Sequence, residues 1–171
     1  MNSISARALS GLLILIGSVA SAGVISSGTT TIPGTFFFDY DAGVLTATGA
    51  NDTFWDIINV GVEAMVPTNG AAIVNLGAVS FAALTVAQMQ GLSYSNAAIA
   101  GSLLVPNDVF AVQTNSGNFA KVLVTGPLNT SNGIPIQWET DSASAVPEPS
   151  TIALCLAALT ALAWKRYRVA E

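Results

Sequence analysis

The sequence predicts a mainly β protein: a small sandwich- or meander-like domain with one short helix, flanked by two apolar terminal segments. Three observations lead to this fold class. Short runs rich in Val, Ile, Thr and Phe are separated by turns that contain Gly, Asn or Pro, as in strands joined by hairpins. Only 9% of the 171 residues are charged, and the chain between its ends is rich in small and β-branched residues. That length leaves room for one domain once the ends are set aside.

The first 22 residues have the three parts of a secretory signal peptide. Arg7 supplies the positive charge, residues 8–19 form the apolar region, and Ala20 and Ala22 are the small residues that signal peptidase requires. We therefore expect cleavage between Ala22 and Gly23. The alternative, a retained N-terminal anchor, is disfavoured because the apolar run is short and ends in small residues.

The exported body then comprises residues 23–145, enough for one independent core. It opens with a Ser-, Thr- and Gly-rich lead-in, 23–34, which we expect to be loose, and closes with a polar linker of small residues, 141–145. Between them, apolar and β-branched runs predict strands. The expected strands are 35–40 and 44–48, joined as a hairpin across 41–43, followed by 71–76, 79–83, 109–114, 118–124 and 134–140.

Residues 52–66 fit two periodicities. Apolar residues fall at helical spacing from Phe54, whereas those between Ile58 and Val66 alternate. The β-branched content favours a strand that runs from Ile57 onwards. A turn should follow at 67–70, where Pro, Asn and Gly occur together.

One short helix is expected at residues 85–90. Thr85 and Gln88 stand three residues apart in a capping-box pattern, and Gly91 follows as a helix stop. The apolar run 97–105 that comes after the helix is expected to be buried.

The strongest local signal in the body is a hairpin over residues 109–124. Two apolar, alternating runs face each other across the loop 115–117, whose glycine can adopt a positive φ. The alternation directs Gln113 and Lys121 to solvent. The side chains that should point into the core are those of Phe110, Val112, Val122 and Val124.

The charge distribution argues against a nucleic-acid partner. The formal net charge is −5, and Lys121 is the only cation in the body, which carries eight Asp and Glu residues. A body with this balance repels a phosphate backbone. We therefore expect no nucleic-acid binding.

Catalytic and cofactor motifs are absent from the sequence. There is no His, and the single cysteine, Cys155, lies in the C-terminal apolar segment. These absences exclude catalysis by Ser-His-Asp or Cys-His groups. They also exclude zinc sites built from His or Cys. No Walker loop occurs, nor a G-x-G-x-x-G between a strand and a helix. We expect a non-enzymatic protein without a cofactor.

Carboxylates are the remaining chemical groups. Asp39 and Asp41 could join Asp52 or Asp56 around an oxygen-ligated ion such as calcium. The local pattern departs from a calcium loop, because the third ligand is missing and Ala50 stands where the closing Glu belongs. We therefore expect no metal site and surface roles for these residues. A paired-carboxylate glycosidase site is a further, less favoured alternative.

Aromatic residues offer another kind of site. Trp55, Tyr94 and Trp138 are of the type that stacks on sugar rings in carbohydrate-binding modules. In a small β domain, however, tryptophans usually pack in the core. Exposed, coplanar rings on one sheet face would favour sugar binding, and buried rings would favour a structural role.

The C-terminal segment, residues 146–171, has three parts in a fixed order. The stretch Pro147-Glu148-Pro149 is stiff and cannot enter a helix or an inner strand. Residues 151–164 then form a helix that is apolar all round, which suits lipid. A basic cluster typical of the cytoplasmic side of a membrane follows, with Lys165, Arg166 and Arg168.

This order resembles the PEP-CTERM sorting tail of exported bacterial proteins, over residues 146–168 only. The resemblance implies that a membrane-embedded exosortase cuts near Pro147-Glu148-Pro149 and releases or transfers the protein. It also implies a setting of exopolysaccharide, aggregates and biofilm. The alternative is a plain C-terminal membrane anchor, for which the 15 residues 150–164, about 22 Å of helix, fall short of a hydrocarbon core of about 30 Å.

From the sequence we therefore expect an exported, non-enzymatic cell-surface or extracellular-matrix protein. It should cross the bacterial inner membrane, be held transiently by its C-terminal transmembrane sorting helix, and then reach the cell surface or the medium. The expected partners are signal peptidase, an exosortase-like membrane protease and exopolysaccharide. The main alternative is a carbohydrate-binding module with the same sorting tail.

Overall fold

Two antiparallel sheets and one short α-helix make up the part of the chain that the computed structural model describes, residues 22–49, 51–57, 63–127 and 133–145. The prediction of a mainly β protein with one short helix is thus confirmed for these residues. No helix among them is long and apolar enough to span a membrane. The predicted signal peptide, apart from Ala22, and the predicted sorting tail lie outside the described residues.

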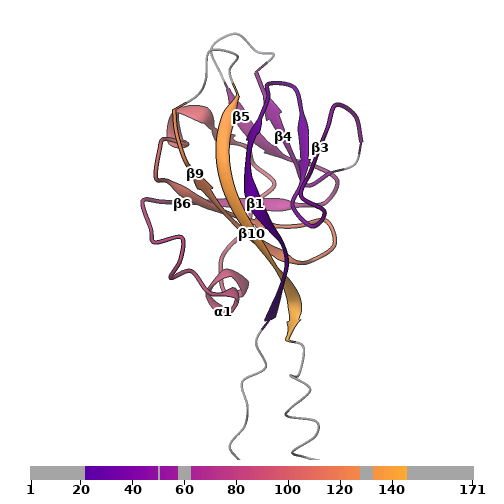
Figure 1. Ribbon diagram of the computed structural model, residues 1–171, viewed down its shortest axis with the longest axis vertical. Helices are drawn as coiled ribbons and strands as arrows, with labels where there is room; N and C mark the ends of the chain where they lie inside the picture. Colours follow the sequence, from indigo (N-terminus) through magenta and orange to yellow (C-terminus); the bar gives the residue numbers. More distant parts are fainter. Residues whose placement is uncertain (1–21, 50, 58–62, 128–132, 146–171) are drawn as a thin grey trace, which may run out of the picture. The chain divides into compact units, whose positions relative to one another are not determined.

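The first sheet has the strand order β1-β10-β9-β8-β6 (Figure 1). Its strands β8, β9 and β10 follow one another along the chain, and β1 and β6 are its edges. The predicted hairpin is confirmed, because β8 and β9 pair around a loop in which Gly117 has a φ of 81°. The strands of this sheet are β1 Ala22–Ile32, β6 Ala72–Gly77, β8 Val109–Gln113, β9 Phe119–Val124 and β10 Ile134–Ala145.

The second sheet has the order β3-β2-β4-β5-β7. The predicted first hairpin is confirmed, with Asp39 opposite Val44. The predicted turn at 67–70 is also confirmed, and Asn69 and Gly70 adopt the positive φ that it requires. The strands of this sheet are short: β2 Phe37–Asp39, β3 Val44–Thr46, β4 Thr53–Asp56, β5 Ala64–Pro67 and β7 Ile99–Ala100.

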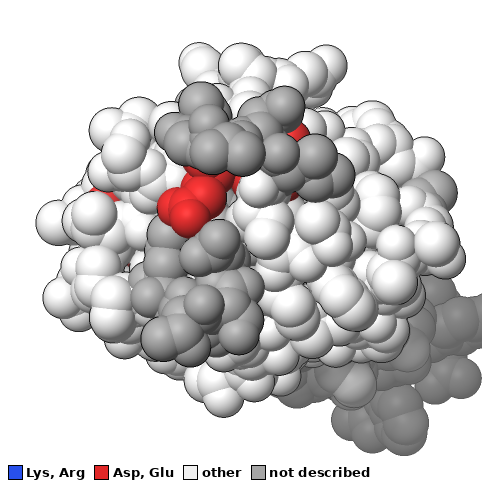
Figure 2. Space-filling view, turned by 90° about the horizontal axis from the view of Figure 1, so that it is seen from above, with Lys and Arg blue, Asp and Glu red and all other residues white. Residues whose placement is uncertain are grey.

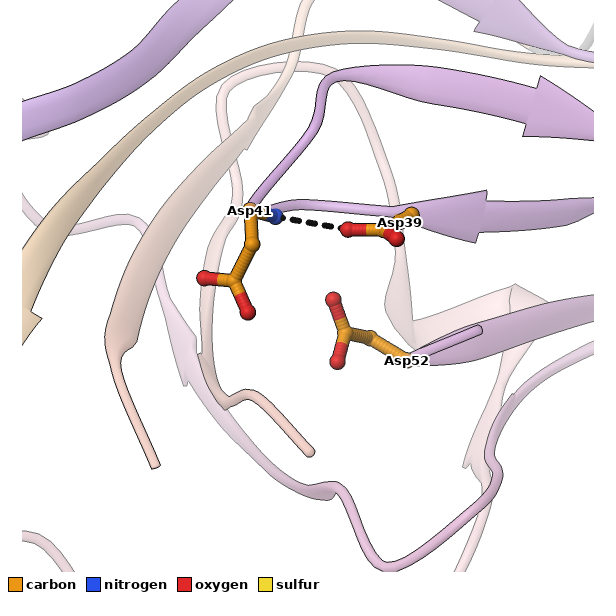
Figure 3. A group of neighbouring side chains, drawn as sticks. All are labelled: Asp39, Asp41 and Asp52. Atoms are coloured by element: carbon orange, nitrogen blue, oxygen red, sulfur yellow. Dashed lines mark hydrogen bonds between the residues drawn. The ribbon is translucent and has the colours of Figure 1, made fainter. Parts of the chain in front are cut away.

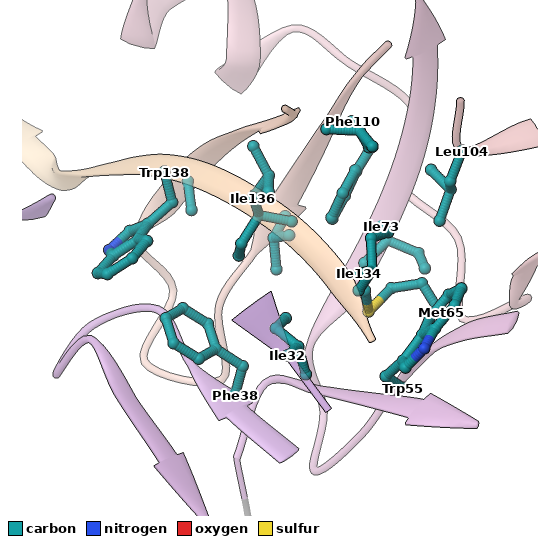
Figure 4. Packing of buried hydrophobic residues seen from close by; sticks show 14 of the residues in the cluster. Ile32, Phe38, Trp55, Met65, Ile73, Leu104, Phe110, Ile134, Ile136 and Trp138 are labelled. Carbon is teal, nitrogen blue, oxygen red and sulfur yellow. The ribbon is translucent and has the colours of Figure 1, made fainter. Parts of the chain in front are cut away.

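One hydrophobic core lies between the two sheets (Figure 4). Alternate residues of each strand point into it, as expected from the period of two of a β-strand. The four core residues predicted from the hairpin, Phe110, Val112, Val122 and Val124, are all fully buried. From the second sheet the core receives Phe38, Trp55 and Met65, which are at most 1% exposed.

Trp138 of β10 joins the two sheets and the edge strand. Its ring packs edge-on against Phe38 of the second sheet, with the ring centroids 4.9 Å apart. Its Nε1 donates a hydrogen bond of 3.0 Å to Ser26 Oγ in β1. Two glycines make room for the indole, because a Cβ atom at Gly28 would lie 2.7 Å from the ring and one at Gly43 would lie 3.0 Å from it.

The helix α1, Val86–Gln90, lies over the outer face of the first sheet (Figure 1). The predicted capping box is present, because the Thr85 hydroxyl accepts from Gln88 N and Gln88 Oε1 accepts from Thr85 N. Met89 is fully buried in a second apolar cluster with Ala111 and Phe119. The helix therefore helps to cover the face of the sheet that turns away from the main core.

This outer layer overturns one predicted side-chain position. Lys121 was expected in solvent, but it is only 6% exposed. Its ammonium group lies 2.8 Å from Glu139 Oε1, donates to Leu84 O at 3.3 Å and stands 5.0 Å from the centre of the Phe81 ring. The alternation of β9 was read correctly, since Lys121 does point away from the core, but residues 81–84 cover that face.

Both predicted loose ends of the body are wrong. Residues 23–32 of the expected lead-in belong to β1, and the expected linker 141–145 is the last part of β10. The two segments pair with each other from Ala22 opposite Ala145 to Ile32 opposite Ile134. Each segment is therefore stabilised by hydrogen bonds to the other strand, which its own sequence does not predict.

Three further predictions also need correction. The strand expected from Ile57 onwards is instead β4, which ends at Asp56, followed by β5 from Ala64, and residues 58–62 lie outside the described part. Residues 79–83 form a loop rather than a strand, with Val79 43% exposed. The run 97–105 is only partly buried, because Leu103 is 56% exposed while Leu104 is 3% exposed.

The first testable prediction concerns the space for Trp138. Gly28→Ala should lower the free energy of unfolding of residues 22–145 by about 1–3 kcal/mol, because the added methyl group collides with a ring that its neighbours hold in place. Urea unfolding followed by tryptophan fluorescence measures this. Gly23→Ala is the matched control in the same strand, since no atom lies within 4 Å of the added Cβ. Equal effects of the two substitutions would contradict the role given to Gly28.

Candidate functional site

Three carboxylates from the second sheet come together at one place (Figure 3). Asp39 ends β2, Asp41 lies in the turn to β3, and Asp52 stands just before β4. Each offers a carboxylate oxygen, and these oxygens lie within 4.8 Å of one another. The sequence suggested this grouping as an alternative to the preferred surface roles. Asp56, which was also considered, is not part of the group.

Asp39 stabilises the turn that follows it. Its Oδ1 accepts hydrogen bonds from the backbone N–H of Asp41 at 3.0 Å and of Ala42 at 2.9 Å. This is the usual turn-forming role of an aspartate, in which the carboxylate satisfies nearby backbone donors. The turn residue Gly43 completes the bend with a φ of 68°.

Asp52 connects the two sheets through backbone donors. Its Oδ2 accepts from Tyr40 N at 2.8 Å, and its Oδ1 accepts from Asn115 N at 2.7 Å in the β8–β9 loop. The residue is 0% exposed, so the surface role expected for it is wrong. Burial raises its pKa from 3.8 to about 6; the two backbone N–H groups act in the opposite direction, and the charges of Asp41 and Asp39 raise it further.

Asp41 contacts the same loop through a side chain. Asn118 Nδ2 donates to Asp41 Oδ1 at 3.1 Å, and Asn118 Oδ1 accepts from Ala143 N at 3.1 Å. Asp41 Oδ2 is buried and has no hydrogen-bond partner among the described residues. The sequence placed Asn115 in the expected loop and Asn118 at the start of the expected strand 118–124, and no local signal marks such long-range partners.

The arrangement fits a structural role better than catalysis or metal binding. Calcium requires six to eight oxygen ligands, whereas Oδ1 of Asp39 and both carboxylate oxygens of Asp52 already accept from backbone N–H groups. A catalytic acid must reach its substrate, whereas Asp52 is fully buried. We therefore interpret the cluster as a connection between the β2–β3 turn, β4 and the β8–β9 loop.

The aromatic residues considered for sugar binding are placed differently from a binding platform. Trp55 is 0% and Trp138 7% exposed, both in the main core. Tyr94 packs in the outer cluster at 5.9 Å from the Phe119 ring, and its hydroxyl donates to Met89 O at 3.1 Å. Core positions for both tryptophans agree with the sequence interpretation.

An open, mostly apolar hollow of about 500 Å³ lies beside α1. The sequence gave no sign of it, because residues 79–83 were read as a strand. Few polar side chains line it, and Gln88 Oε1 already accepts from Thr85. The lining residues are Leu76, Val79, Ser80, Ala83, Leu84, Gln88 and Leu92.

Most predicted processing residues lie outside the described part of the chain. Ala22 and Gly23, on either side of the expected cleavage site, are the first residues of β1. Ala20 and the motif and basic residues of the tail are not described. On the described surface, the view in Figure 2 shows acidic side chains and no basic one, in keeping with the burial of Lys121.

The raised pKa of Asp52 predicts a specific pH dependence. Between pH 4 and 6 the folded protein holds a proton on Asp52 that the unfolded chain has lost, so the contribution of this group to stability falls as pH rises. The stability advantage of the wild type over Asp52→Asn should therefore shrink by about 2 kcal/mol across this range. Urea titrations of both proteins at several pH values measure it, and a constant difference would contradict the assignment.

The structural interpretation of the carboxylates also predicts the response to metals. The melting temperature of residues 22–145 should be nearly the same in a chelator and in millimolar calcium, because backbone donors already occupy Oδ1 of Asp39 and both oxygens of Asp52. Differential scanning calorimetry measures this. A calcium-dependent increase of several degrees that Asp41→Asn abolishes would instead identify a binding site.

Comparison with known proteins identifies no relative for this chain. No family model, no curated protein and no solved structure matches it. Inferences about function therefore depend on the residues and contacts described above and on the tail sequence.

Proposed function

We propose that the chain is an exported, non-enzymatic cell-surface or extracellular-matrix protein that an exosortase-like membrane protease processes at Pro147-Glu148-Pro149. Signal peptidase first removes residues 1–22. The apolar helix 151–164 then holds the protein at the bacterial inner membrane until the sorting motif is cut. The body, released or transferred, takes its place among exopolysaccharide at the cell surface or in the matrix.

The observation that carries this proposal is the order of the terminal segments. A charged n-region, an apolar run and small residues open the chain. The chain closes with a Pro-Glu-Pro stretch, an apolar run that is shorter than the hydrocarbon core of a membrane, and a basic cluster. Each end alone has simpler explanations, but both together give one consistent topology, with the body outside and the basic cluster inside.

The ends of the body support this arrangement. The first strand begins at Ala22 and the last ends at Ala145, and these two residues are paired. The ladder of the first sheet therefore reaches the expected cleavage site at one end and stops two residues before Pro147 at the other. Cleavage at both sites would remove only the Ala22–Ala145 pair from the β1–β10 ladder.

A structural role for the body is supported by how its chemical groups are used. Trp55 and Trp138 lie in the core. Asp39 and Asp52 accept from backbone N–H groups of turns and strands, and Asp41 accepts from the Asn118 side chain. The aromatic pair on the outer face of the second sheet, Phe37 and Phe54, is half-buried, and its rings are tilted by 39°. These rings are not coplanar, so they favour the carbohydrate-binding alternative less than a flat pair would.

The proposal predicts that the sorting motif matters more than the hydrophobicity of the tail. A protease that reads an extended, charged stretch outside the lipid needs Glu148 and the stiffness of Pro149. Glu148→Ala and Pro149→Ala should therefore lower the ratio of released to membrane-bound protein several-fold in a host that contains an exosortase. Fractionation and immunoblotting measure this ratio.

The controls separate processing from simple anchoring. Ser150→Ala changes a neighbouring residue outside the motif and should leave the ratio as in the wild type. In a host without exosortase, all variants should remain with the membrane. If Glu148→Ala and the wild type are released equally where exosortase is present, the tail is a plain anchor and the proposed function fails.

A further inference from the structure

The outer edge of β1 is open along most of its length. Strand β1 is at the end of the first sheet and pairs only with β10. Gly23, Val24, Ile25, Ser27 and Thr29 are exposed. An edge strand of this kind presents a row of N–H and C=O groups that can pair with another strand.

The ladder determines which backbone groups point outward. Thr125 N donates to Pro135 O, so Pro135 directs its backbone to β9. Because the direction alternates along an antiparallel strand, Trp138 and Ile136 direct theirs to β1. Their partners in β1 are Gly28 and Thr30. The residues that alternate with these, Ser27, Thr29 and Thr31, therefore turn their N–H and C=O groups away from the sheet. No described residue forms a hydrogen bond with these groups.

This edge has little of the protection that edge strands usually carry. Natural edges are interrupted by charged residues, prolines or bulges, or are very short. Between 22 and 32 there is no charged residue and no proline. The register is irregular only between Ala22 and Ser26, and Pro33 follows the strand. A regular, uncharged stretch of seven residues, 26–32, remains.

We propose that this edge pairs with the same edge of a second copy of the chain, antiparallel and two-fold symmetric about Thr29. In this register Thr29 lies opposite Thr29, and Ser27 opposite Thr31, so each outward N–H meets a C=O of the other copy. The facing side chains are all hydroxyl-bearing, a favourable kind of cross-strand pair. The two first sheets become one continuous sheet.

The charges of the body permit this self-association although each copy is acidic. Beside the regular stretch, the ionic residue on β10 is Glu139, which lies opposite Ser27 and is paired with Lys121. In the proposed pairing the two Glu139 residues are three strand spacings, about 14 Å, apart across the sheet and a further four residues apart along the strands. That exceeds the screening length of about 8 Å at physiological salt. Like-charge repulsion is therefore small at this edge.

The size of the contact sets the expected affinity. Seven residues span about 23 Å, so the ladder buries far less than the roughly 800 Å² per partner of a standard interface. The pairing should be weak and concentration-dependent. It becomes populated where copies are crowded, and it is lost on dilution.

Thiol cross-linking of the full chain, purified in mild detergent, tests the pairing. Cys155→Ser removes the only native thiol, and Thr29→Cys places one thiol per copy at the two-fold axis. A short bis-maleimide should then yield a covalent dimer, increasing with protein concentration and several-fold above the control. Ser102→Cys, an exposed position away from β1, is that control.

A second substitution tests the edge itself. Ser27→Lys should reduce the Thr29→Cys dimer to the control level, because a lysine on the edge opposes pairing, whereas Ser27→Val should preserve it. Circular dichroism should show both variants folded, since residue 27 is exposed. Cross-linking of Thr29→Cys no greater than that of Ser102→Cys, or unchanged by Ser27→Lys, overturns the proposal. An adduct that mass spectrometry assigns to another protein overturns the assignment to a second copy.

Discussion

The burial of Trp138 is the constraint on which the rest of the fold depends. The indole fills the space between β1, the β2–β3 turn and Phe38, and it leaves room for no side chain at Gly28 and Gly43. Burying a ring of this size contributes about 5 kcal/mol. The hydrogen bond from its Nε1 to Ser26 Oγ satisfies the one polar atom that burial would otherwise leave unpaired. One side chain thus fixes the position of the edge strand and the separation of the sheets.

The buried carboxylate cluster lowers the stability that apolar burial provides, but it also determines how the turns of the two sheets meet. Holding Asp52 in a buried site costs about 3 kcal/mol at neutral pH, judged from its raised pKa. The carboxylate nevertheless accepts Tyr40 N from one sheet and Asn115 N from the loop of the other. Without an acceptor, both donors would be left unsatisfied, at a comparable cost. Apolar burial holds the sheets together, and the polar contacts determine how the turns at one end meet.

Sequence reasoning succeeded where the deciding chemistry is local. The loop around Gly117 and the capping box of Thr85 depend on residues a few positions apart, and both were predicted correctly. It failed for β1 and the end of β10, which stabilise each other across more than a hundred residues. The inward side of β1 carries Gly28 and small polar residues to fit Trp138, so no apolar alternation is visible. The exposure of Lys121 was predicted wrongly because the residues that bury it, 81–84, come from a different part of the chain.

The pairing of Ala22 with Ala145 has a consequence for orientation. Both ends of residues 22–145 leave the first sheet at the same end of the β1–β10 pair, seen in Figure 1 as the indigo and orange strands running side by side. When two copies join through antiparallel β1 strands, these ends point in opposite directions. The two copies then present their C-terminal ends at opposite ends of the joined sheet. Under the proposed function, such a contact joins copies that face one another more readily than copies held side by side on one surface.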